Sequence, residues 1–288
     1  MIRQTFLLVS SLVLSTGVYA QPAKIDFPGA SPTATLKQRV GLTDVEITYS
    51  RPSVKGRAML GHINPYGLVW RVGANDATTI TFSRAVKLNG ADVPAGAYEL
   101  FAIPDPSEWT IILSKASKQW GAYTYNAKDD AVRFKAKAVP LAEPLETFTI
   151  DYSDYHIGKA TLNMSWEKTR VLIEVEDDAV ATVAAQIDAA LTSAENKTSR
   201  FYISAAQFYY DADLDPKKAL TWVDAAIALK PPTYSIETLR AKLLAKSGDK
   251  EAAIAQAKDA IELAKKGVEP ARSEYMRLNE DIIARLGP

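Results

Sequence analysis

The chain has 288 residues, no cysteine, and 34 basic against 34 acidic side chains, so its formal net charge is zero. This balance disfavours nucleic acid as a partner, because nucleic acids are bound through an excess of Lys and Arg. The lack of cysteine excludes disulfides and thiolate chemistry, and two histidines are too few for a zinc site of His and Cys ligands. We expect no metal and no cofactor.

Residues 1–20 have the pattern of a cleaved signal peptide. Arg3 supplies the positive start, residues 6–14 form an apolar run, and Val18-Tyr19-Ala20 is typical of a cleavage site. The run is shorter than the about 20 apolar residues that a membrane span requires, so we expect no span after cleavage. The sequence thus predicts an exported protein, periplasmic or extracellular, with a proline-containing linker at residues 21–33.

Residues 34–176 alternate between apolar and polar side chains. Val45, Ile47 and Tyr49 share one face of a predicted strand, and Leu162, Met164 and Trp166 share one face of another. Turn sequences such as Asn89-Gly90 separate these runs. Roughly eight or nine short strands with one polar face predict an antiparallel β-sandwich or barrel.

From residue 177 to residue 288 the apolar period changes to that of helices. Asp215-Pro216 is a typical helix start, because aspartate caps the free N–H groups and proline is tolerated in the first turn. We therefore predict an α+β protein with two segregated domains. The expected helices are 178–195, 199–211, 216–229, 235–246, 249–265 and 270–286.

The helical part contains a sequence repeat. Ala219 and Ala226 recur 34 residues later as Ala253 and Ala260. This period and these small residues resemble two tetratricopeptide units, 199–232 and 233–266, which would present a concave surface to another protein. The alternative is an ordinary helical bundle whose periodicity arose by chance.

Residues 51–76 combine glycine, charge and aromatic rings, as long functional loops do. An arginine would grip a carboxylate or phosphate through its planar guanidinium, and a tryptophan would offer an apolar plate. Segment 120–125 would form an opposite wall. The alternative is that these side chains only pack within the fold. The candidate ligand-binding residues are Arg57, His62, Trp70, Arg71, Asn75 and Trp120.

No catalytic motif is complete, and we assign no catalytic residue. Asp211, Asp213 and Asp215 have the spacing that opens a calcium loop, but Pro216 occupies the position where that loop needs glycine. Residues 165–168 match the Ser-x-x-Lys pattern of acyl-transferring enzymes, but they lie at a predicted strand end and not at a helix start.

Several segments together resemble the exported bacterial domain-of-unknown-function family 2911. They include Val45 to Pro52, Lys55-Gly56-Arg57, residues 70–75 with the pattern Trp-Arg-x-Gly-Ala-Asn, Pro94 to Tyr98, and Trp109. The resemblance covers residues 31–175. It implies an exported β domain that is sometimes followed by helical repeats, and it implies no activity.

These observations favour an exported, non-enzymatic binding or scaffold protein. Its β domain would hold a small polar ligand or a peptide, and its helices would contact another protein. One alternative is an envelope hydrolase acting on glycan or peptide, with His62, Asp76 or Asp130 as the base. Another is a purely structural domain.

Overall fold

The computed structural model describes residues 27–115 and 119–287. The predicted signal peptide and residues 21–26 of the predicted linker lie outside the described residues. Residues 27–32 form bends and coil, and the first strand begins at Thr33.

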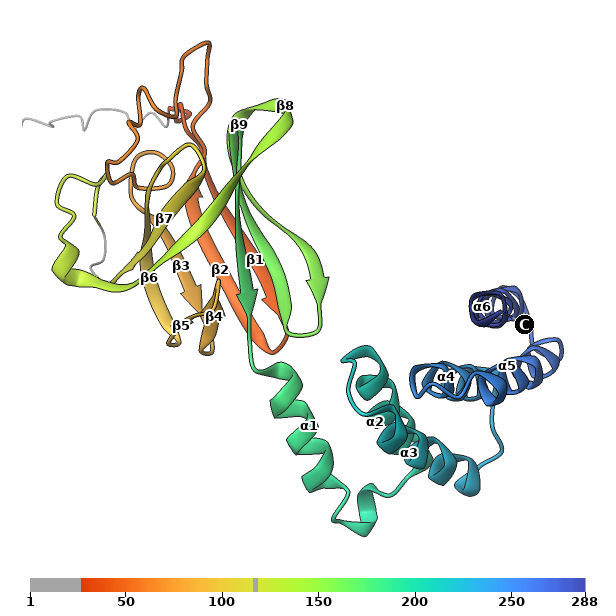
Figure 1. Cartoon of the computed structure of the whole chain (residues 1–288). Helices are drawn as coiled ribbons and strands as arrows, with labels where there is room; N and C mark the ends of the chain where they lie inside the picture. Colours follow the sequence, from red (N-terminus) through yellow and green to blue (C-terminus); the bar gives the residue numbers. More distant parts are fainter. Residues whose placement is uncertain (1–26, 116–118, 288) are drawn as a thin grey trace, which may run out of the picture.

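An antiparallel sheet comes first in the chain, and six α-helices follow it (Figure 1). The strands are β1 (Thr33–Val40), β2 (Thr43–Ser50), β3 (Thr78–Phe82), β4 (Val86–Leu88), β5 (Ala91–Val93), β6 (Gly96–Ile103), β7 (Glu108–Ser114), β8 (Asp130–His156) and β9 (Lys159–Glu176). Among the described residues they form one sheet in the order β1-β2-β3-β6-β7-β8-β9-β4-β5. The sheet is open, with β1 and β5 at its edges. The α+β class is confirmed, whereas a sandwich or a closed barrel is not.

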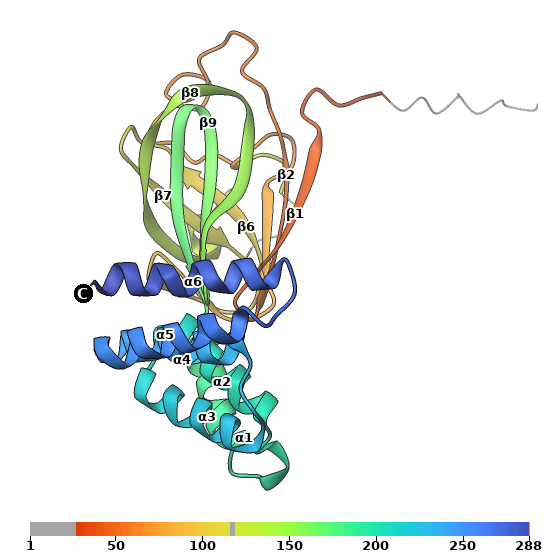
Figure 2. The ribbon, with the colours of Figure 1, turned by 90° about the vertical axis from the view of Figure 1, so that its right-hand side faces the viewer.

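The long strands β8 and β9 curve the sheet (Figure 2). Their pairing shifts register between Pro140 and Leu145 and again before Thr149, and such irregularities bend strands. The chain that continues β2 lies beside the second half of β8, where Phe148 N donates to Pro52 O at 2.9 Å. The inner face of the sheet is therefore enclosed.

Apolar side chains at alternate positions fill this inner face. The rings of Trp109, Phe148 and Trp166 have their centres 5.3–5.8 Å from that of Trp70. A smaller cluster of Ala77, Phe101 and Ile112 lies apart from this core, with Val69, Ile103, Ala122 and Tyr125 packed against it. Because Leu100 belongs to the inner core and Phe101 to the smaller cluster, strand alternation assigns that cluster to the outer face.

Asp177 joins the sheet to the first helix. Its buried carboxylate accepts hydrogen bonds from Leu42 N at 2.6 Å, Thr43 Oγ1 at 3.2 Å and Ala179 N at 2.9 Å. A Cβ on Gly41 would lie 2.2 Å from Asp177 Oδ1, so only glycine leaves room there. One carboxylate thus ties the β1–β2 turn to the start of α1.

The helices are α1 (Ala179–Ala190), α2 (Ser199–Asp211), α3 (Pro216–Leu229), α4 (Tyr234–Lys246), α5 (Lys250–Ala264) and α6 (Ala271–Leu286). They agree with the predicted ranges except that α1 ends earlier, and Ala194–Asn196 is a separate 3-10 turn. Successive helices from α2 onward pack mainly on one another, away from the sheet (Figures 1 and 2). Asp215 caps α3 through Lys217 N and Lys218 N, as its sequence predicts. None of the described helices has the length and apolar character to cross a membrane.

Candidate functional site

Alternation in residues 69–72 decides which candidates reach the surface. Val69 packs in the outer cluster, whereas Trp70 and Val72 belong to the inner core. Arg71 lies between the two core residues in sequence, so its side chain points to the outer side. The segment is fixed there because Trp70 and Ala102 exchange backbone hydrogen bonds of 2.7 and 2.9 Å.

Trp70 is not the apolar plate that we predicted. Only 6% of it is exposed, and its indole N–H donates to Gly73 O at 3.2 Å. It stacks on Trp166 with an interplanar angle of 15°. Burial of this large ring stabilises the sheet and anchors the loop that carries Arg71.

Arg71 is half-buried and has no ion-pair partner among the described residues. Its Nε is fully buried and donates to no acceptor in the described part of the chain. Its Cζ lies 6.0 Å from the centre of the Trp120 ring, a cation–π arrangement. This guanidinium is held in place, and none of the described acidic groups forms an ion pair with it.

Trp120 and Tyr123 form the wall opposite Arg71. They are 63% and 78% exposed, and their rings stack with centres 5.8 Å apart and an interplanar angle of 21°. Gly121 lets Tyr123 and Arg71 lie close together. A Cβ at this position would lie 2.7 Å from the Tyr123 ring and 3.0 Å from Arg71 Nη1. The sequence predicted this wall for Trp120, and the structure brings Trp120 and Arg71 together.

Glu99 positions that wall. It is 2% exposed, and its carboxylate accepts from Gln119 N at 2.7 Å and Gln119 Nε2 at 2.6 Å. Pairing of residues 75–77 with 119–121 completes the support, since Ala77 N donates to Gln119 O and Gly121 N to Asn75 O, both at 3.0 Å. Sequence reasoning missed Glu99, although an acid within the apolar run of β6 was a usable signal.

The loop from Arg71 to Thr78 has an unusual backbone. Val72 has φ 54°, which is rare for a β-branched residue, and Asn75 has φ 58°. Thr78 holds the loop, because its Oγ1 donates to Val72 O at 2.6 Å. The Asn75 amide donates to Ser31 O and Ser50 Oγ, both at 3.3 Å, so it ties the loop to the segment before β1 and to the end of β2. Such strained loops often occur at functional sites.

Arg57 and His62 lie on another loop. Arg57 and His62 are both exposed. The Arg57 guanidinium donates to Val54 O and Ser53 O. That loop is held by Glu167, whose carboxylate accepts from Met59 N at 3.0 Å and Leu60 N at 2.8 Å. It borders a hollow of about 640 Å³ that neither Arg57 nor His62 lines. None of the described interactions joins these two residues to Arg71.

A model of the family of proteins of unknown function DUF2911 matches residues 31–175, just over half of the chain. The chain belongs to this family. The match confirms the predicted resemblance and includes Arg71, Glu99, Trp120 and Tyr123, whereas the helices lie outside it. No curated protein and no solved structure matches the chain.

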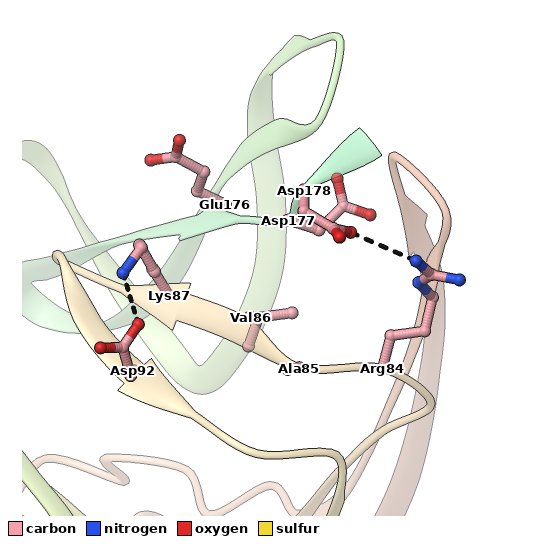
Figure 3. A pocket seen from close by; sticks show the side chains of 8 residues that line it. All are labelled: Arg84, Ala85, Val86, Lys87, Asp92, Glu176, Asp177 and Asp178. Carbon is pink, nitrogen blue, oxygen red and sulfur yellow. Dashed lines mark hydrogen bonds and ion pairs between the residues drawn. The ribbon is translucent and has the colours of Figure 1, made fainter. Parts of the chain in front are cut away.

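A second hollow, of about 550 Å³, borders the end of the DUF2911 part (Figure 3). Its charges neutralise one another, because Arg84 pairs with Asp178 at 3.2 Å and Lys87 pairs with Asp92. The Asp92 carboxylate raises the pKa of Lys87, as expected of a paired ammonium. These groups already have partners, so this hollow is a weaker candidate than Arg71. Nowhere in the described residues do three or more His, Cys, Asp or Glu side chains gather as metal ligands.

Proposed function

We propose that this DUF2911 protein is an exported, non-enzymatic binding protein that holds a small anionic ligand at Arg71, Trp120 and Tyr123. The observation that carries the proposal is the Arg71 guanidinium, which lies over the Trp120 ring and has no hydrogen-bond or ion-pair partner among the described residues. The terminal nitrogens of this guanidinium are not buried, and a carboxylate or a phosphate that accepts from them would give Arg71 an anionic partner.

The three bases considered for a hydrolase do not favour catalysis. His62 is exposed on a separate loop, and Asp76 is exposed beside Trp120. Asp130 is held by Arg133 and by Tyr125, whose hydroxyl lies 2.9 Å from both carboxylate oxygens. Because Asp130 is already neutralised and the other two are not paired with a nucleophile, we favour binding over catalysis.

Export, to the periplasm or the exterior, rests on the signal-peptide pattern of residues 1–20.

Thermal unfolding tests the anion site. A ligand that binds only the folded state raises Tm, so acetate or inorganic phosphate should raise Tm above that in chloride at equal ionic strength. Arg71→Met should remove this difference. Arg57→Met is the matched control, because it removes an exposed guanidinium that donates to Val54 O and Ser53 O in its own loop, and it should leave the difference intact. An equal response of wild type and Arg71→Met would contradict the proposal.

We further propose that the helices are tetratricopeptide-like and contact a protein. Residues 34 apart have equal roles: Ala219 and Ala253 are both 0% exposed, as are Ala226 and Ala260. Asp215 caps α3 and Asp249 caps α5. Equivalent caps and equivalent buried alanines favour a true repeat over chance periodicity.

Exposed apolar side chains in the helical part mark where a partner would bind. Leu229 is 54% exposed and Val268 is 77% exposed. A photo-crosslinking residue at either position should yield a discrete adduct in the envelope, while the same residue at exposed Lys258 on α5 should not. The partner proposal fails if all three positions give the same pattern.

A further inference from the structure

We propose that the ligand at Arg71 is an acidic sugar in a polymer, namely a chain of hexuronate units. This inference rests on the proposed anion-binding function and adds the chemical class of the ligand. It follows from the charge at the site, from the aromatic wall and from the openness of the surface.

The charge at the site matches a carboxylate. Arg71 is the one cation that the described contacts place against Trp120, whereas Asp76, which pairs with Trp120, and buried Glu99 bring negative charge close to the same wall. This balance suits a ligand group with a single negative charge. A phosphate with nearly two charges calls for a second cation. The two terminal nitrogens of the guanidinium, which are not buried, present parallel N–H groups that suit the two oxygens of a carboxylate.

The aromatic wall matches a sugar ring. Trp120 and Tyr123 stack with an interplanar angle of only 21° and remain 63% and 78% exposed. Aromatic faces carry partial negative charge, and the axial C–H groups of a pyranose carry partial positive charge, so the two surfaces attract. In a hexuronate the carboxylate is attached to the ring itself. One unit therefore brings the ring to the wall while its acid group reaches Arg71.

The openness of the site matches a polymer. Trp120 and Tyr123 are largely exposed, and the described hollows of about 640, 550 and 460 Å³ are lined by other residues. Small free ligands are usually bound in clefts that bury 70–90% of their surface. A polymer compensates for shallow contact with each unit, because many identical units raise the effective concentration at the site.

Binding of three defined probes tests the inference, using the chain without residues 1–20 at fixed ionic strength. The probes are an oligogalacturonate, its methyl ester, which keeps the rings without charge, and poly-L-glutamate, which keeps the carboxylates without rings. We expect the oligogalacturonate to bind at least tenfold more tightly than either other probe. Trp120→Ala should weaken oligogalacturonate binding at least tenfold and leave poly-L-glutamate binding unchanged.

The variants separate failure of this inference from failure of the anion site. Arg71→Met should abolish binding of both charged probes, and the control Arg57→Met should change neither. If poly-L-glutamate binds as tightly as the oligogalacturonate and only Arg71→Met weakens both, the sugar inference is overturned while the anion site stands. If neither charged probe binds, if the methyl ester binds as tightly, or if Arg71→Met has no effect, both are overturned.

Discussion

Replacing Asp177 by alanine removes the carboxylate that joins the sheet to α1. Two backbone donors, Leu42 N and Ala179 N, and the hydroxyl of Thr43 would lose their acceptor in a buried place. At about 1–3 kcal/mol for each of the two unsatisfied backbone donors, Asp177→Ala should destabilise the β part by at least about 2 kcal/mol. Asp177→Asn keeps one acceptor oxygen and should cost about half as much.

Urea unfolding followed by tryptophan fluorescence measures this effect. Four of the five tryptophans lie in the β part, and Trp222 lies in α3, so a Trp222→Phe background makes the signal report on the sheet alone. Asp178→Ala is the matched control, because Asp178 is exposed and its contacts with Arg84 and with the Thr182 hydroxyl lie at the surface. It should change stability by less than about 1 kcal/mol. If Asp177→Ala costs no more than Asp178→Ala, the role assigned to Asp177 is refuted.

Three further predictions follow from named contacts. Gly121→Ala should displace Tyr123 and lower stability by more than about 1 kcal/mol in urea unfolding, because φ is +77° and the new Cβ would lie 2.7 Å from the ring; a neutral result would contradict the packing described here. Ala219→Leu and Ala253→Leu should each lower the free energy of unfolding of the helical part by about 1–3 kcal/mol, measured by circular dichroism. The exposed control Ala255→Leu should leave it unchanged. Clearly unequal costs at positions 219 and 253 would argue against a repeat. Burial raises the pKa of Glu237, so its contribution to stability is present below its ordinary pKa of 4.5 and is lost as the pH rises through the folded-state value. Glu237→Gln should therefore raise Tm at pH 7 more than at pH 4, and an equal change at both values would contradict this reasoning.

The sequence predicts the secondary structure well where local rules dominate. The start of α3 follows from Asp215-Pro216, whose capping role needs no tertiary information. The strand containing Val45, Ile47 and Tyr49 follows from alternation, and these residues are buried as expected. How far the sheet curves depends on register shifts within β8 and β9, which alternation does not reveal.

The candidate site is predicted only in part because its residues meet through long-range pairing. Trp120 reaches Arg71 because residues 119–121 pair with residues 75–77. The composition of residues 51–76 predicts Trp70 at the surface, but alternation with Arg71 places it on the opposite face, in the core. Arg57 and His62 were grouped with Arg71 by sequence proximity, but they lie on a loop held by Glu167. The supporting role of Glu99 depends on its contact with Gln119 across the fold.

The side-chain Nε–H resonance of Arg71 in a ¹⁵N-labelled protein tests the central claim most directly. It is assigned by its disappearance in Arg71→Lys, and the Nε–H of Arg57, which donates to Val54 O at 3.0 Å, is the internal reference. If Arg71 binds an anion, titration with oligogalacturonate should shift the Arg71 resonance with saturation and leave that of Arg57 in place. If the two resonances move together, or if the Arg71 resonance does not move, Arg71 is not the receptor of an anionic ligand.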